Sequence, residues 1–249
     1  MLSITRSKLD SREHISSVQK CFDHSHSSLI SKSIRLSVKN FIFKPINAIV
    51  LLIIFTFSVI LCNYFKHYSL FGLLFVSLIG YYAIVIAYIS YRSYFGWKAF
   101  IKSVVTESDI SFKWANQVYS KEKNALFIAN KTNSNELVIA SAALLIGEEK
   151  NSKIIIGPEI ELLELSENQG LLTHVGVLPK YFGNGYGKAI VKACIEFAKS
   201  KNVKTIKLCT SSSQLEAISL YKSLGFKITV VKELIPLLGF KVMAMELIL

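Results

Sequence analysis

Three glycines at alternate positions are the residues of this sequence with the clearest chemical potential. Gly183, Gly185 and Gly187 follow an apolar, β-branched run that ends at Val177, and they precede a run with helical periodicity. Glycine lets the backbone approach a ligand closely, and a helix N-terminus offers free N–H groups and the positive end of the helix dipole. The spacing therefore predicts a strand-to-helix turn that binds an anion, most often phosphate or pyrophosphate.

Two familiar phosphate motifs do not match this turn. The dinucleotide fingerprint G-x-G-x-x-G, started at Gly183, needs a glycine where the sequence has Lys188. A P-loop needs Ser or Thr after its Gly-Lys pair, and Ala189 occupies that position. A glycine cluster that is only a turn remains the alternative on local spacing, so the residues that follow have to decide.

The block after the turn resembles the GNAT superfamily of acetyl-CoA-dependent N-acetyltransferases, from about residue 125 to residue 228. The family's loop, Q/R-x-x-G-x-G/A, is similar to residues 182–187, and Phe182 stands where the family has Arg or Gln. Backbone N–H groups would then hold the pyrophosphate, with Lys180 or Lys188 supplying positive charge. The second signature, a polar residue and Ala followed by L-Y-x-x-x-G-F, matches Gln214, Ala217, Leu220-Tyr221 and Gly225-Phe226.

The resemblance implies an acetyl-CoA site without a metal. Backbone N–H groups of the strand at Val175 and Val177 would bind the thioester carbonyl, which stabilises the oxyanion without a side chain. The turn would bind the pyrophosphate, and Gln214 would hydrogen-bond the pantetheine arm. The implied cofactor-binding residues are Val175, Val177, Gly183, Asn184, Gly185, Tyr186, Gly187, Lys188 and Gln214.

Two side chains are candidates for proton transfer. Tyr221 matches the tyrosine that the family uses as general acid towards the leaving thiolate, and an aromatic residue packed in the core is the alternative. His174 is a possible base for the ammonium proton, and a structural histidine is its alternative. Strand alternation puts the His174 side chain on the face opposite Val175 and Val177, although a bulge would change this.

Composition narrows the class of protein. The 249 residues carry a net charge of +12 and are 51% hydrophobic, which is high for a soluble domain. The positive charge is scattered and no recognition motif accompanies it, so nucleic-acid binding is not expected. Four cysteines show neither disulfide nor metal spacing. His24 and His26 lack a further ligand at metal spacing, so we expect them in a solvated loop.

Two uncharged runs predict a membrane hairpin. They span residues 46–64 and 69–91, and each is long enough to cross a hydrocarbon core of about 30 Å. Most of the nearby basic residues lie outside the pair, which places both ends, and the domain that follows, in the cytosol and favours contact with a lipid bilayer. A pair of buried core helices is the alternative interpretation.

The expected fold is an α/β (α+β) GNAT acetyltransferase fold with an inserted two-helix transmembrane hairpin. Residues 1–45 contain a strand within 1–10, a helix over 11–28 and a basic approach to the membrane. The hairpin occupies 46–91, and the catalytic core occupies 92–249. We expect further helices over 106–121 and 187–200, and strands near 126–130, 136–147, 153–165, 205–210, 226–232 and 241–248.

The two membrane runs, the T-E-S-D-I segment and the GNAT core together resemble the camello-like, or NAT8-like, membrane N-acetyltransferases. That resemblance implies an integral membrane protein of the endoplasmic reticulum. It also implies acetyl transfer to a primary amine, either a cysteine S-conjugate or a protein lysine. The alternatives are a catalytically weak or inactive scaffold that binds CoA or a partner protein, and a hairpin protein that only shapes membranes.

Overall fold

The computed structural model describes residues 2–7, 12–43, 49, 52–53, 55–57, 59–60, 64, 68–107, 118–119, 121–131, 136–147, 165–235 and 240–249. It divides into two compact units. The first contains Met1–Leu29, Trp97–Lys232 and Lys241–Leu249, and the second contains Ile30–Gly96 and Glu233–Phe240.

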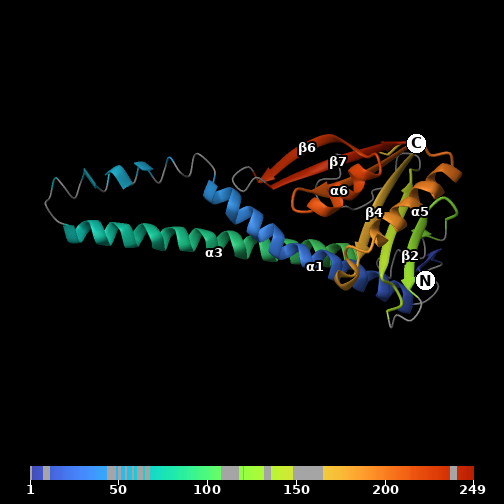
Figure 1. Ribbon diagram of the computed structural model, residues 1–249, viewed down its shortest axis with the longest axis horizontal. Coiled ribbons are helices and arrows are strands. Elements are labelled where there is room, and N and C mark those ends of the chain that lie inside the picture. Colours follow the sequence, from blue (N-terminus) through green and yellow to red (C-terminus); the bar gives the residue numbers. More distant parts are fainter. Residues whose placement is uncertain are drawn as a thin grey trace. The chain divides into compact units, whose positions relative to one another are not determined.

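One seven-stranded sheet, with strand order β1-β2-β3-β4-β5-β7-β6, organises the described part of the chain (Figure 1). Only β4 and β5 are recorded as a parallel pair, whereas β1–β2, β2–β3, β3–β4 and β5–β7 are antiparallel. The strands are β1 Leu2–Arg6, β2 Ala125–Lys131, β3 Ala140–Ile146, β4 Gln169–Val177, β5 Thr205–Ser211, β6 Lys227–Ile235 and β7 Phe240–Ile248. β1 pairs with β2, and Ile30–Gly96 of the second unit lie between these two strands in the chain.

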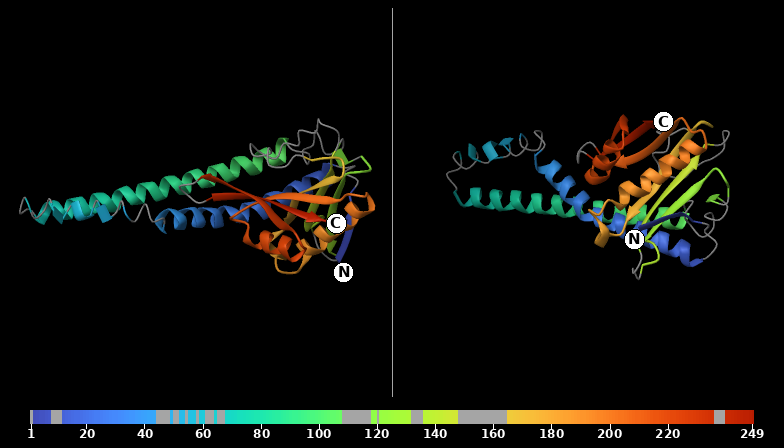
Figure 2. Two further views of the ribbon diagram at one scale, coloured as in Figure 1. Left: turned by 90° about the horizontal axis from the view of Figure 1, so that it is seen from above. Right: turned by 45° about the vertical axis from the view of Figure 1, so that its right-hand side comes forward.

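Helices α5 Tyr186–Ser200 and α6 Leu215–Ser223 pack on one face of this sheet, and the first turns of α1 Arg12–Phe43 pack on the other. The structure also describes α3 Tyr68–Glu107 and a short 3-10 helix, η2 Pro179–Tyr181. The apolar stripe of α5, formed by Ile190, Val191 and Cys194, is fully buried in one core cluster with Leu172 of β4. The neighbouring Leu171 faces the other side, in a second cluster with α1. Figures 1 and 2 show α5 lying along the strands.

The second unit has a small core of its own. Phe41 and Ile89 are buried there, and Val38, Tyr82 and Val85 pack against them. Many other large apolar side chains of this unit are exposed, among them Ile79, Ile84, Tyr88 and Tyr91 of α3, each more than half accessible.

Several sequence expectations change in the structure. The helix expected over 11–28 continues to Phe43, and the strand expected over 136–147 is shorter, Ala140–Ile146. Among the residues that the structure describes, no helix is both long enough and apolar enough to cross a membrane. The transmembrane hairpin over 46–91 is therefore not supported, and much of 46–64 lies outside the described residues. The expected strand 153–165 and most of the expected helix 106–121 lie outside them too.

Candidate active site

The parallel strands β4 and β5 separate from each other partway along their length. Residues Gln169–Leu171 of β4 pair with Thr205–Lys207 of β5, and the two strands are not paired beyond Leu171. β4 continues to Val177 and β5 to Ser211. Within the described residues, the edge of β4 that faces β5 therefore lacks a neighbouring strand beyond Leu171. Backbone groups on such an edge need another hydrogen-bond partner, so the opening is a suitable place for an extended ligand.

A bulge in β4 sets which side chains face each side of this opening. Thr173 pairs with Ala143 and Gly176 with Ser141, so His174 and Val175 oppose a single residue of β3. His174 has a φ of 52°, in the left-handed region that non-glycine residues seldom adopt. The extra residue reverses the phase of alternation along the strand.

The bulge gives β4 two chemically different faces. Val175 and Val177 pack with the cluster that contains α5 and α6. His174 points to α1, where its ring centroid lies 5.5 Å from that of Phe22. Gly176 faces α1 as well, because a Cβ there would meet Ser25. His174 therefore lies on the face opposite Val175 and Val177, which agrees with alternation counted back from Val175. Counted forward from Leu172, alternation would put His174 on the α5 face, and the bulge reverses this.

The glycine turn presents a group of unpaired backbone donors. Gly183 and Gly185 have φ values of 78° and 77°, and Gly185 is the N-cap residue of α5. None of the amide N–H groups of residues 183–188 has a hydrogen-bond acceptor among the residues that the structure describes. Converging amides at a helix N-terminus form an anion site. The Asn184 amide donates to the carbonyls of Tyr181 and Phe182, at 3.1 and 3.2 Å, which holds the turn together.

The third glycine connects the turn to β4. Gly187 has an ordinary backbone conformation, and a Cβ there would lie 3.6 Å from Val177 and 3.5 Å from Leu220 of α6. The end of the glycine turn, where α5 starts, therefore lies beside the end of β4 and beside the helix that carries Tyr221. Lys188 is exposed, and Phe182 is 49% exposed, so the position where the family has Arg or Gln is open to solvent here.

Tyr221 is buried, with 7% of its surface accessible, and it packs against Phe226 and the α5 cluster. Burial, with a smaller effect of Cys194, raises the pKa of the phenol, so Tyr221 keeps its proton at neutral pH. Its hydroxyl has no hydrogen-bond partner among the described residues. Buried hydroxyls are normally paired, so this donor is available to a ligand.

Gln214 has only one end free for a ligand. It is the N-cap residue of α6, and its Oε1 accepts hydrogen bonds from the Thr210 hydroxyl at 2.9 Å and from the Ser211 amide at 3.1 Å. These bonds fix the side chain at the end of β5. The amide NH₂ group is left as the part that can contact a pantetheine arm.

The α1 face holds a residue that the sequence interpretation missed. His26 was expected in a solvated loop, but it lies in α1, is 9% exposed, and stacks on Phe22 with ring centroids 3.9 Å apart. Burial lowers the pKa of His26 to about 4. Helical spacing could have found it, because Val18, Phe22 and His26 recur every four residues. His24 is exposed, and the described residues contain no group able to hold a metal ion.

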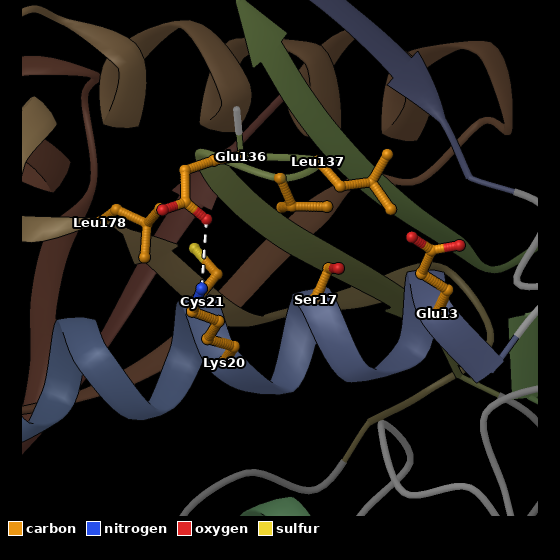
Figure 3. A pocket seen from close by; sticks show the side chains of 8 residues that line it. Glu13, Ser17, Lys20, Cys21, Glu136, Leu137 and Leu178 are labelled. Carbon is orange, nitrogen blue, oxygen red and sulfur yellow. Dashed lines mark hydrogen bonds and ion pairs between the residues drawn. The ribbon is translucent and has the colours of Figure 1, made fainter. Parts of the chain in front are cut away.

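A small polar cavity of about 190 Å³ lies beside the end of β4. Figure 3 shows Glu13, Ser17, Lys20 and Cys21 projecting from α1 towards Glu136 and Leu178. Lys20 and Glu136 form an ion pair of 3.3 Å across it. Burial raises the pKa of the Cys21 thiol to about 12, so this cysteine is a neutral thiol and not a nucleophile.

These features define an α/β domain that opens between two parallel strands and carries, beside that opening, backbone amides with no acceptor among the described residues. The profile of the acetyltransferase (GNAT) family matches residues 87–226, more than half of the chain. The chain belongs to this family.

Two curated relatives match a shorter stretch. Human N-acetyltransferase 8B is 40% identical over 65 residues, which is 26% of this chain and 29% of the relative. A mouse protein named probable N-acetyltransferase family 8 member 5 is 35% identical over the same share of each chain. The chain thus spans less than a third of the length of these relatives. A putative streptothricin acetyltransferase from Bacillus anthracis, solved with acetyl coenzyme A, is 20% identical, with a TM-score of 0.41 over 54% of this chain and 68% of its own.

Proposed function

We propose that this protein is an acetyl-CoA-dependent N-acetyltransferase that transfers the acetyl group to a primary amine. The observation that carries the proposal is the set of amides at residues 183–188, which have no acceptor among the described residues and lie next to the end of β4. Membership of the GNAT family supports the same activity. The names of the human and mouse relatives also indicate N-acetyl transfer.

In this proposal, acetyl-CoA binds along the face of β4 that carries Val175 and Val177. The amides of residues 183–188 hold the pyrophosphate, and Lys188 adds positive charge. The NH₂ group of Gln214 donates to the pantetheine arm. Backbone N–H groups between Val175 and Val177 donate to the thioester oxygen, where negative charge develops during attack. Residues 1–45 and 92–249 supply this domain, and residues 46–91 are a separate segment.

Proton transfer completes the reaction. The amine nitrogen attacks the thioester carbon, a C–N bond forms, and the C–S bond breaks. The CoA thiolate then takes the proton of Tyr221, whose buried phenol is protonated and has no partner among the described residues. In this proposal the amine loses a proton to His174 or to water on the α1 face.

A matched pair of variants tests the anion site. Gly185 is exposed, its φ is 77°, and a Cβ there would meet no atom within 4 Å. Asn and Asp both tolerate a left-handed backbone, so Gly185→Asn and Gly185→Asp differ mainly in charge. We expect Gly185→Asp to weaken CoA binding at least about tenfold more than Gly185→Asn, measured by calorimetry, because a carboxylate repels pyrophosphate. Equal affinities of the two variants would contradict the proposed site.

An inactive scaffold that binds CoA is the second candidate, and the exposed Phe182 favours it. A charge-assisted hydrogen bond from Arg or Gln is missing at this position. A wild-type protein that binds CoA but transfers acetyl to no amine would support the scaffold over the enzyme.

For the acceptor we propose a cysteine S-conjugate or a protein lysine, as the resemblance to camello-like enzymes implies. Purified protein with acetyl-CoA, offered S-benzyl-cysteine and a lysine-containing peptide in parallel, distinguishes the two classes. Acetylation of neither compound would exclude both.

Membrane attachment is part of the proposal. The uncharged runs 46–64 and 69–91 and the exposed apolar side chains of α3 support burial of this segment in lipid. We place the attached protein in the endoplasmic reticulum with both ends in the cytosol. Alkaline carbonate extraction of cell membranes tests attachment, and glycosylation tags at each end test the orientation. Release of the protein by carbonate, or glycosylation of either tag, would contradict this arrangement.

A further inference from the structure

The tautomer of His26 can be read from its surroundings. Its Nδ1 lies 3.0 Å from the Phe22 carbonyl oxygen and 2.9 Å from the Ser25 hydroxyl. The Ser25 hydroxyl itself donates to the same carbonyl, at 2.9 Å. A carbonyl oxygen can only accept, so Nδ1 carries the proton and donates it. In a neutral imidazole the other nitrogen, Nε2, is then an acceptor with a free lone pair.

This Nε2 has no hydrogen-bond partner among the described residues, although His26 is more than nine-tenths buried. Buried acceptors without a partner are rare in folded proteins and call for a ligand or an ordered water. The charged or titratable groups that act on the ring are His174 of β4, which disfavours a positive charge, and Asp23 of α1, which favours it. Burial has the largest effect, and the ring stays neutral.

His26 also lies beside the reacting segment of β4. Its ring stacks on Phe22, and Phe22 meets His174 edge-on. The same part of α1 packs closely against Gly176. A Cβ at this position would lie 2.8 Å from the Ser25 hydroxyl and 3.6 Å from the Cys21 carbonyl. Gly176 stands between the two valines whose backbone would hold the thioester. His26 is therefore across β4 from the anion site.

We propose that His26 belongs to the acceptor side of the acetyl-transfer site, and that its Nε2 accepts a hydrogen bond from the attacking amine. This inference rests on the proposed acetyltransferase function. One N–H bond of the amine points to Nε2, and the nitrogen lone pair is then free to face the thioester carbon. His26 binds and orients the acceptor in this step and exchanges no proton with it.

Two substitutions separate this role from a structural one. In His26→Asn the amide group occupies about the place of Nδ1, so the bond to the Phe22 carbonyl is kept and the Nε2 acceptor is lost. In His26→Gln the amide group reaches about the place of Nε2 and restores an acceptor there. The assay measures KM and kcat with whichever of S-benzyl-cysteine and the lysine peptide the wild-type protein acetylates.

We expect His26→Asn to raise the KM for the amine about 10- to 100-fold, the loss of one buried hydrogen bond. The KM for acetyl-CoA should stay within about twofold, although thermal unfolding should shift to a lower temperature, because the buried ring that stacks on Phe22 is lost. His26→Gln should recover most of the affinity for the amine. An unchanged amine KM in His26→Asn would overturn the inference while the proposed function stands. Equal losses of amine affinity in both variants would show a structural role and overturn it as well.

A wild-type protein that acetylates no amine would overturn the proposed function and this inference with it. If His26→Asn does not fold, ¹⁵N NMR of histidine in the full wild-type chain tests whether the amine contacts His26. With CoA bound, addition of whichever of S-benzyl-cysteine and the lysine peptide the wild-type protein acetylates should shift the Nε2 resonance of His26. A resonance that does not move at saturating amine would overturn the inference.

Discussion

The two faces of β4 differ in the kind of group that they offer to a ligand. On the α5 and α6 face, the candidate ligand contacts are mostly backbone amides, at residues 183–188 and along the strand, and Tyr221 is the one reactive side chain assigned there. On the α1 face, the proposed contacts are side chains, those of His26 and His174. Backbone amides suit an invariant partner such as a pyrophosphate, because their placement depends little on the residue type.

The two family motifs lie on only one of these faces. The glycine turn and the L-Y-x-x-x-G-F signature both lie on the α5 and α6 face. No motif covers His26 or the cavity at Glu13 and Glu136. The acceptor side is therefore the part of the site that a family resemblance leaves undefined. Three predictions test whether the two faces act separately.

The largest effect should come from Tyr221→Phe on the α6 face. Removal of a general acid lowers kcat about 10²- to 10⁴-fold. The ring is kept and the hydroxyl has no partner among the described residues, so stability should barely change. Steady-state kinetics and calorimetry with CoA check this, and the KM for the amine is the control for the α1 face. A folded variant with wild-type kcat would show that Tyr221 only packs in the core.

On the α1 face, the low pKa of His26 makes stability depend on pH. The folded pKa of about 4 is below the ordinary value of 6.5, so between these values the unfolded chain binds more protons than the folded chain. The contribution of neutral His26 is complete above about pH 6.5 and is lost as the pH falls towards 4. The loss is on the order of 3 kcal/mol, from about 1.4 kcal/mol per pKa unit.

Comparison with His26→Asn isolates this effect, because Asn does not titrate and the carboxylates are common to both proteins. Urea unfolding at pH 7 and at pH 4.5 should show the wild type losing more free energy of unfolding than the variant. Parallel losses in the two proteins would mean that the imidazole is solvated in the folded chain.

The smallest effect should come from two glycines that test how tightly each face is packed. Gly176→Ala places a methyl group 2.8 Å from the Ser25 hydroxyl and should destabilise the protein by about 1–3 kcal/mol. Gly187→Ala, on the other face, meets only ordinary contacts at 3.5 Å and should be neutral or slightly stabilising. Adding Ser25→Ala should rescue part of the loss in Gly176→Ala. Purely additive losses in this mutant cycle would show that α1 does not press on β4.

The sequence by itself determined the features that depend on local chemistry. The glycine turn that opens a helix, the helix that carries Tyr221, and the strands at 205–211 and 227–235 follow from residue type and spacing over short distances. The sequence interpretation failed where helix length depends on packing. It ended the first helix near residue 28, although burial recurs along α1 beyond that point, at Ile30, Ser33, Ser37 and Phe41.

Only the tertiary structure decided how the site is divided. The bulge at His174 arises from its pairing with β3, a strand more than 25 residues away in the chain. The separation of β4 from β5 likewise depends on where pairing stops. His26 acquires its low pKa because the folded chain buries the ring and removes it from water. Each of these depends on contacts between distant segments, and such contacts leave no periodicity or motif in the residues that make them.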